Sequence, residues 1–214
     1  MTQLQQSALP ITIQRVSFTL ISIFIAKILI QWGPSAIAVQ RVGIQIESIA
    51  FMTIGGLQGA VAAFIGQNFG AHNPDRIKKG YMKGLFITSL FGILVTILFM
   101  LFPRPIFALF LADESSLYLG VDYLRIIGAS QLFMCVELMT VGAFNGIGKT
   151  YIPPIFSIIL TTLRIPMAIV LSHYYGLNGV WISIALSSVL KGIILVIWFI
   201  RTLNKMTQRK AGTC

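Results

Sequence analysis

Charged residues are scarce in this sequence. They account for 10% of the 214 residues, whereas a typical soluble domain carries about a quarter. Hydrophobic residues account for 56%, and the mean hydropathy is +0.86. So little charge excludes an ordinary soluble domain and predicts a polytopic membrane protein.

Histidine and cysteine are also rare, with two residues of each. His72 and His173 fall on opposite sides of the predicted membrane, so they cannot share a metal ion or a proton. Cys135 lies within an apolar stretch and Cys214 is the last residue, which predicts neither a disulfide framework nor a thiolate metal site. We therefore expect no catalytic residue, no metal site and no cofactor, and we expect that the protein is not an enzyme.

The net charge of +10 does not indicate nucleic-acid binding, because the basic residues cluster in short loops and at the C-terminus. Nucleic-acid binding requires a basic face on a folded domain, and no stretch outside the apolar ones is long enough to form one. The opening residues, MTQLQQSALP, lack the positively charged region of a signal peptide. The apolar stretch that follows is expected to be the first membrane span.

Apolar stretches of about 20 residues suffice to cross a bilayer as helices. Six of them predict an all-α integral membrane protein with six transmembrane helices, at Ile11–Trp32, Ala36–Gly66, Met82–Phe102, Leu117–Ala143, Ile152–Leu171 and Gly179–Ile200. The second and fourth are long enough to tilt or to extend beyond the hydrocarbon. We therefore divide the chain into an N-terminal segment (residues 1–10), a six-helix bundle (residues 11–202) and a basic cytoplasmic tail (residues 203–214).

Basic residues are distributed unevenly between the two sides of the predicted membrane. Short loops rich in lysine and arginine remain in the cytoplasm. One side carries most of the basic residues near the ends of the spans, namely Arg76, Lys78, Lys79, Lys83, Lys149, Arg201, Lys205, Arg209 and Lys210. The other side carries Arg104, accompanied by Asp113 and Glu114. This asymmetry predicts that both termini are cytoplasmic.

The second apolar stretch carries a polar stripe. Gln40, Glu47 and Gln58 lie within about 20° of one line along a helix, because they are about two and three turns apart. A carboxylate at this depth costs about 2.5–3.5 kcal/mol unless it faces a cavity or a partner. Glu47 is therefore a candidate for binding an ion or a substrate, with Gln40 and Gln58 beside it. The alternative is a structural acid that is hydrogen-bonded or paired with a cation. The spacings Gly55–Gly59 and Gly66–Gly70 predict close helix packing.

Glu137 lies near the middle of the fourth stretch and is a second candidate for binding a proton, a sodium ion or a cationic substrate. A structural role is equally compatible with the sequence, since Arg164 or Lys191 on a neighbouring helix would neutralise it. Both cations lie deep in the fifth and sixth stretches and require such a partner. Pro166 predicts a kink next to Arg164.

Asp122 and Arg125 are close to the start of the fourth stretch, at a spacing that places them on one helix face. We expect them to form an interfacial ion pair. Such a pair satisfies both charges without a substrate, so we assign these two residues, like Arg164 and Lys191, to structural charge.

Three stretches of sequence are distinctive: LPITIQ (residues 9–14), IQIESIAFMTIGGLQGAVAAFIGQNFGAHNPDRIKKG (residues 44–80) and GAFNGIGKTYIPP (residues 142–154). Together they resemble the C-terminal half of the multidrug and toxic compound extrusion (MATE) transporters. The strongest signal is the run GQNFGA, which Glu47-Ser48 precede and Asn73-Pro74 follow. The resemblance covers nearly the whole chain.

The resemblance implies a fold of two six-helix bundles that face each other across a central cavity, with the six stretches here corresponding to helices seven to twelve. It implies a multidrug efflux antiporter of the bacterial cell inner membrane, surrounded by lipid, that exports cationic or amphipathic compounds in exchange for Na⁺ or H⁺. An N-terminal six-helix lobe is the expected partner, because alternating access requires two bundles that rock about a shared site. This chain alone is not expected to transport.

The sequence departs from the family pattern at several positions. Some members carry an acid in the first helix of this half, where Ser17 and Phe18 stand here, and another in the fourth helix near Met134. Gln40-Arg41 stands where many members have His-Gln. Two other functions remain open. One is a lipid-linked saccharide flippase of related architecture, which would need several cations in its cavity, and the other is an inactive remnant or structural membrane module.

Overall fold

The computed structural model describes residues 2–111 and 113–211. Helices make up nearly all of this part of the chain, and none of it forms a strand. The elements are α1 (Thr2–Leu29), the short 3-10 helix η1 (Ile30–Trp32), α2 (Pro34–Gly70), α3 (Pro74–Leu101), α4 (Pro103–Ala108), α5 (Glu114–Gly128), α6 (Gln131–Gly146), α7 (Ile152–Thr162), α8 (Arg164–Tyr175) and α9 (Leu177–Ala211). The all-α fold expected from the sequence is confirmed.

Five helical segments are long and apolar enough to cross a membrane, and the bent pair α5–α6 makes a sixth if it counts as one span. The six stretches chosen from hydropathy are thus all found. Helix α2 has 37 residues and α9 has 35, so each is about 50–55 Å long and extends beyond a hydrocarbon layer of about 30 Å. Helix α9 continues through residue 211, so the tail that we separated at residue 203 begins as part of this helix.

Two of the predicted spans are interrupted. The fourth is divided at residues 129 and 130, where α5 and α6 meet at an angle of 51°. The fifth is divided at Leu163, between α7 and α8. The second interruption lies where Pro166 lacks the N–H that would bond to the carbonyl of Thr162. Residues Ile152–Tyr175 nevertheless form one continuous candidate span, so the kink expected there stays a prediction. The first interruption has no proline and was not expected.

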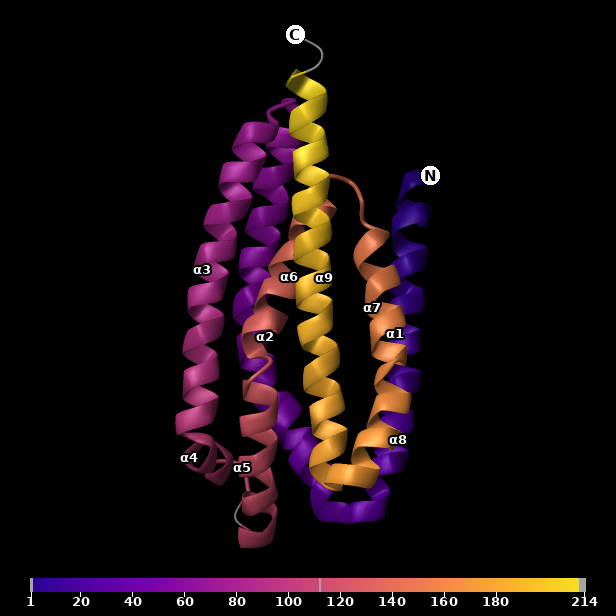
Figure 1. Cartoon of the computed structure of the whole chain (residues 1–214), viewed down its shortest axis with the longest axis vertical. Coiled ribbons are helices and arrows are strands. Elements are labelled where there is room, and N and C mark those ends of the chain that lie inside the picture. The colour runs from indigo at the N-terminus through magenta and orange to yellow at the C-terminus, as the bar shows by residue number, and fades with distance from the viewer. Residues whose placement is uncertain (1, 112, 212–214) are drawn as a thin grey trace.

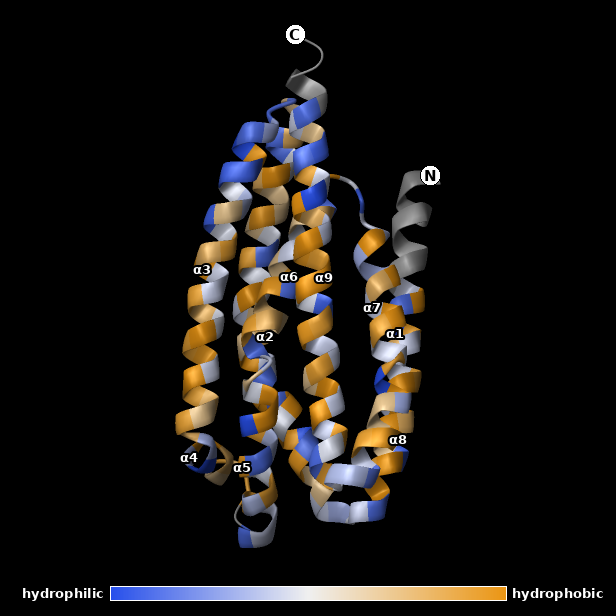
Figure 2. Cartoon of the chain, viewed as in Figure 1, coloured by the Kyte–Doolittle hydropathy of each residue, from blue (hydrophilic) through white to orange (hydrophobic). Residues whose placement is uncertain are grey.

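The helices form two groups that α9 connects (Figure 1). Helices α2, α3, α5 and α6 pack against one another, α1 packs against α7 and α8, and α9 contacts members of both groups. The α2–α3 turn, the α6–α7 connection and the last turns of α9 lie at one end of the bundle, while α4, η1 and the α8–α9 turn lie at the other. We call the first of these the basic end, because it carries Arg76, Lys79, Lys149 and Lys205. Figure 2 shows that the middle of the bundle is largely apolar and that hydrophilic residues gather at the basic end.

Helices α2 and α6 pack closely against each other. A Cβ atom added at Gly142 of α6 would overlap the backbone carbonyl of Gln58, and one added at Gly146 would lie 2.7 Å from the carbonyl oxygen of Ala62. By contrast, a Cβ atom at Gly55 or Gly59 of α2 would have no neighbour within 4 Å. The expectation that these two α2 glycines mediate close packing is therefore wrong for the contacts within this bundle. Of the second pair, Gly66 does face α6, since its Cβ atom would lie 3.4 Å from the carbonyl oxygen of Gly146, whereas Gly70 has no such neighbour.

Side chains cap two of the helices. Asn73 precedes α3, and its side chain accepts a hydrogen bond from the backbone N–H of Arg76. Asp113 precedes α5 and accepts hydrogen bonds from the Ser115 hydroxyl and from the N–H and hydroxyl of Ser116. These donors, with Ser115 foremost, hold the pKa of Asp113 below its usual value because they favour the charged carboxylate. Both caps satisfy N–H groups that have no partner within the helix.

Candidate ion and substrate site

Glu47 lies in the first half of α2 and is 9% exposed. Its carboxylate accepts a hydrogen bond of 2.6 Å from the hydroxyl of Tyr123 on α5 and one of 3.3 Å from Nε2 of Gln131 on α6. Tyr123 reaches it because Gly43, one turn earlier on α2, has no side chain. A Cβ atom there would overlap the tyrosine ring. That ring and the ring of Trp181 on α9 meet edge to face, at 5.3 Å between ring centroids.

The interruption between α5 and α6 positions these two donors. Gln131 is the first residue of α6, directly after the bend, and Tyr123 lies in the last two turns of α5. Both are at most 1% exposed. Reasoning from sequence missed both residues, because they lie 76 and 84 residues from Glu47 along the chain. The sequence offered no strong signal for them, because the bend between α5 and α6 carries no proline.

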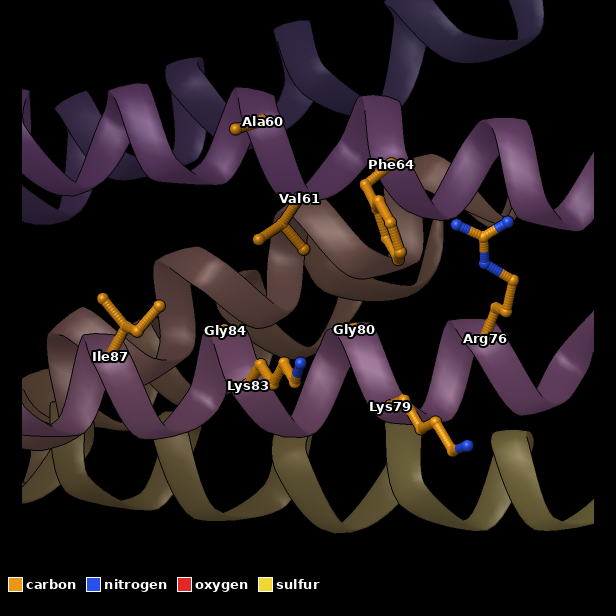
Figure 3. Close-up of a pocket in the computed structure, with 9 residues that line it drawn as sticks. All are labelled: Ala60, Val61, Phe64, Arg76, Lys79, Gly80, Lys83, Gly84 and Ile87. Atoms are coloured by element: carbon orange, nitrogen blue, oxygen red, sulfur yellow. The ribbon is translucent and has the colours of Figure 1, made fainter.

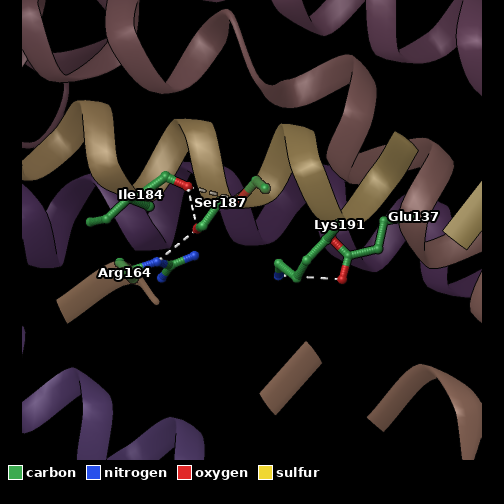
Figure 4. Close-up of polar contacts among 6 residues, drawn as sticks. Glu137, Arg164, Ile184, Ser187 and Lys191 are labelled. Atoms are coloured by element: carbon green, nitrogen blue, oxygen red, sulfur yellow. Dashed lines mark hydrogen bonds and ion pairs between the residues drawn. The ribbon is translucent and has the colours of Figure 1, made fainter. Parts of the chain in front are cut away.

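Glu137 on α6 forms an ion pair with Lys191 on α9, at 3.3 Å between Oε1 and Nζ (Figure 4). Their side chains are 11% and 12% exposed. Lys191 was one of the two partners that the sequence offered for Glu137, and the pair is present. The charges of the two side chains therefore cancel at this point of the bundle.

Arg164, the other cation of this region, begins α8. Its Nε donates a hydrogen bond of 2.9 Å to the hydroxyl of Ser187 on α9, which donates in turn to the carbonyl of Ile184 (Figure 4). The guanidinium also interacts electrostatically with Glu137 and Glu47. We call Glu47, Glu137, Arg164 and Lys191 the buried charge cluster. Two acids and two cations give it no net charge when all four are ionised.

The glutamines of the α2 stripe do not bond to Glu47. Oε1 of Gln40 is buried and has no hydrogen-bond partner among the described residues, and the same holds for Oε1 of Gln131. Gln58 is half-buried and packs through its backbone and Cγ against Gly142 of α6. The two glutamines of the stripe thus differ in environment: Gln58 takes part in the α2–α6 contact, whereas Gln40 has a buried carbonyl oxygen without a partner.

The expected ion pair between Asp122 and Arg125 is not formed, so this expectation was wrong. Asp122 instead accepts a hydrogen bond of 3.5 Å from the side chain of Asn178 at the start of α9. Arg125 is exposed and lies beside Arg104 and Glu114, which pair with each other at 3.2 Å. A spacing of three residues allows a pair on one helix, but here α9 supplies a partner to Asp122 from outside that helix.

The MatE family model matches residues 10–170 of this chain. Among curated proteins, the probable multidrug resistance protein NorM of Thermotoga maritima is 28% identical over 194 residues, which are 89% of this chain and 42% of that protein. The probable multidrug resistance protein YoeA of Bacillus subtilis is 27% identical, over 81% of this chain and 38% of that protein. A FAD transporter of Shewanella oneidensis is 24% identical, over 74% of this chain and 35% of that protein.

Solved structures share the fold. A crystal structure of MATE in the bent conformation superposes with a TM-score of 0.87 at 23% identity. The match covers 95% of this chain and 46% of the chain in that structure. A MOP superfamily transporter from Pyrococcus furiosus gives a TM-score of 0.85 at 23% identity, over 93% and 46% of the two chains. This chain thus spans about half the length of the relatives that it matches. Since the family model covers three quarters of the sequence, the chain belongs to the MatE family of membrane transporters.

Proposed function

We propose that this chain is the C-terminal lobe of a multidrug efflux antiporter, which exports cationic or amphipathic compounds in exchange for Na⁺ or H⁺. The support is membership of the MatE family, the names of the curated relatives, and the share of their length that the chain spans. In this proposal the lobe lies in the bacterial inner membrane with both termini in the cytoplasm, and an N-terminal six-helix lobe completes the transporter. Two lobes are needed because alternating access moves one bundle against the other.

The observation that carries the proposal is the way in which Glu47 is held. Its two hydrogen-bond donors, Tyr123 and Gln131, are neutral, so a proton or a bound cation is what neutralises the carboxylate. The oxygen atoms of the Glu47 carboxylate and the Tyr123 hydroxyl, with Oε1 of Gln131 unpartnered, are of the kind that suits a hard cation such as Na⁺ as well as a proton. We propose that the coupling ion binds at Glu47 and that a cationic drug competes for the same negative charge.

Glu137 has a second role in this scheme. Lys191 neutralises it in the present arrangement, and Arg164 interacts electrostatically with both acids. Loading of Glu47 with a cation or a proton removes one negative charge from the surroundings of Arg164. The guanidinium is then drawn towards Glu137 in competition with Lys191. This shift would transmit ion binding from α2 to α8 and α9.

The flippase alternative is less well supported by the environment of the cations. A pyrophosphate-binding cavity needs cations that are free to receive phosphate oxygens, whereas Lys191 pairs with Glu137 and Arg164 bonds to Ser187. An inactive remnant or structural module has the same fold as a transporting lobe and is distinguished by activity alone.

Efflux of a fluorescent cation such as ethidium tests the proposal. Cells that make this chain together with a MATE N-terminal lobe are expected to expel the dye, and cells that make this chain alone are expected to retain it. Dye retention by both, with both proteins present in the membrane, would favour the remnant.

Neutral substitutions of the two acids test their roles in the complete assembly. Glu47→Gln and Glu137→Gln are each expected to reduce cation efflux at least about tenfold at unchanged protein abundance, because an amide supplies no charge for the ion or for the cationic partner. Glu114→Gln is the matched control, since Glu114 is exposed and pairs with Arg104 at the opposite end from the basic loops. Full efflux after replacement of both Glu47 and Glu137 would remove the acids from the mechanism.

A further inference from the structure

A groove lies between α2 and α3 at the basic end of the bundle, with a volume of about 490 Å³ (Figure 3). Its walls differ in character. Helix α3 contributes three cations, Arg76, Lys79 and Lys83, whereas α2 contributes apolar side chains, Val61 and Phe64 among them. The residues that line the groove include none of the buried charge cluster. The proposed antiport gives the groove no role.

The three cations follow one face of α3. They are spaced by three and four residues, so they lie one above another and span about 10 Å along the helix axis. The described residues that line the groove include no carboxylate. The ion pairs of Arg104 with Glu114 and of Lys191 with Glu137 use none of the three cations. The groove therefore offers concentrated positive charge over a depth comparable to that of the interfacial region of a bilayer.

Apolar surface continues from the cations towards the middle of the bundle. Phe64 packs over Gly80, where a Cβ atom would overlap its ring, and Gly84 faces Val61. These two glycines leave the floor of the groove without side chains of its own. Ile87, the last lining residue of α3, is 55% exposed, and Leu90 and Leu94 extend the exposed apolar surface by two further turns.

We propose that this groove binds an anionic glycerophospholipid, with its phosphate among Arg76, Lys79 and Lys83 and an acyl chain along Val61 and Ile87. Basic pockets between transmembrane helices at the membrane surface suit anionic headgroups. Lysine side chains within a helix extend their ammonium groups towards that surface, so in this proposal Lys83, two turns deeper on α3 than Arg76, extends towards the same headgroup. A free phosphate ion would use the cations but not the apolar floor, and a zwitterionic lipid would use the floor but gain little from three cations.

Native mass spectrometry of the purified chain, released from nanodiscs of equal parts phosphatidylglycerol and phosphatidylethanolamine, tests the proposal. Each cation near an anionic surface contributes about fivefold in affinity, so we expect phosphatidylglycerol to be retained over phosphatidylethanolamine by at least about tenfold. The triple variant Arg76→Gln/Lys79→Gln/Lys83→Gln is expected to bring the ratio close to one. Ala60→Phe, which fills the apolar side of the groove, is expected to reduce retention of both lipids.

Lys78→Gln is the matched control, because Lys78 is an exposed lysine of the same helix that does not line the groove. It is expected to leave the ratio unchanged. If Lys78→Gln lowered the ratio of phosphatidylglycerol to phosphatidylethanolamine as much as the triple variant does, overall charge and not the groove would select the lipid. The proposal would be overturned if the triple variant still preferred phosphatidylglycerol, or if millimolar inorganic phosphate displaced the lipid. A crosslinking experiment with Ala60→Cys could also overturn the proposal. If this cysteine crosslinks to a protein chain and not to a photoreactive phosphatidylglycerol, then a helix and not a lipid occupies the groove.

Discussion

A carboxylate inside a transmembrane bundle needs a cation, hydrogen-bond donors or a proton, and the two buried acids of this lobe meet that need differently. Glu47 is held by the neutral donors Tyr123 and Gln131, whereas Glu137 is paired with Lys191. The first arrangement leaves a charge that an ion can neutralise, and the second does not. The difference between neutral and cationic partners is therefore what separates a candidate ion site from a structural pair.

A double-mutant cycle measures how much of the role of Glu137 is structural. Lys191→Met leaves Glu137 buried without its cation and is expected to lower the free energy of unfolding by about 3 kcal/mol, the lower end of the cost of breaking a buried pair. Adding Glu137→Gln is expected to recover most of that loss, since no charge then remains unpaired. Denaturant unfolding of the purified chain in detergent gives both values. Losses that simply add would show that the two side chains are not coupled.

At the scale of elements, the bend between α5 and α6 and the glycines of α6 decide how the site is assembled. The bend brings Tyr123 and Gln131 from two helices onto one carboxylate. Gly142 and Gly146 let α6 approach the backbone of α2, so that Gln131, earlier on α6, lies within hydrogen-bond distance of α2. In lipid, such close contacts replace the hydrophobic driving force that joins helices in water.

The close α2–α6 contact predicts opposite effects for two glycine substitutions. Gly142→Ala is expected to destabilise the bundle by about 1–3 kcal/mol, because the added methyl group overlaps the backbone of Gln58 and forces the helices apart. Gly55→Ala is the control: its Cβ atom would have open space, and alanine favours a helix over glycine by about 0.5–1 kcal/mol. Thermal unfolding in detergent compares the two. Equal stability of both variants would contradict the packing described here.

At the scale of the whole molecule, the bundle exposes apolar side chains along its length, including Phe18 of α1, Met52 of α2 and Phe86 of α3. In the proposed assembly, lipid covers part of this surface and a second lobe covers the rest. Figure 1 shows that the N-terminal end of α1 and the C-terminal end of α9 point towards the same end of the bundle. The positive residues at that end predict that it faces the cytoplasm.

Single cysteines in a variant without Cys135 and Cys214 test this orientation. A membrane-impermeant maleimide added to spheroplasts is expected to label Leu109→Cys and Tyr174→Cys, at positions that are 81% and 75% exposed. Lys78→Cys and Thr207→Cys are expected to react only after permeabilisation, because basic segments remain inside. Labelling of Lys78→Cys and Thr207→Cys from opposite sides would exclude an even number of crossings between them.

The sequence by itself determined the class of the protein, the number of spans, the family and the identity of the two buried acids. These properties follow from local features: hydrophobic runs long enough to cross a bilayer, acids within those runs, and motifs of contiguous residues. It also identified Lys191 as a possible partner of Glu137, and Pro166 as the residue next to the interruption between α7 and α8.

Only the tertiary structure decided which groups hold Glu47, which glycines pack, that Asp122 bonds to Asn178 and not to Arg125, and where the groove between α2 and α3 lies. These features depend on how each helix is rotated and tilted against its neighbours. In a span that is apolar on most faces, the periodicity of the sequence specifies that rotation poorly, so contacts between residues distant along the chain emerge only when the helices pack.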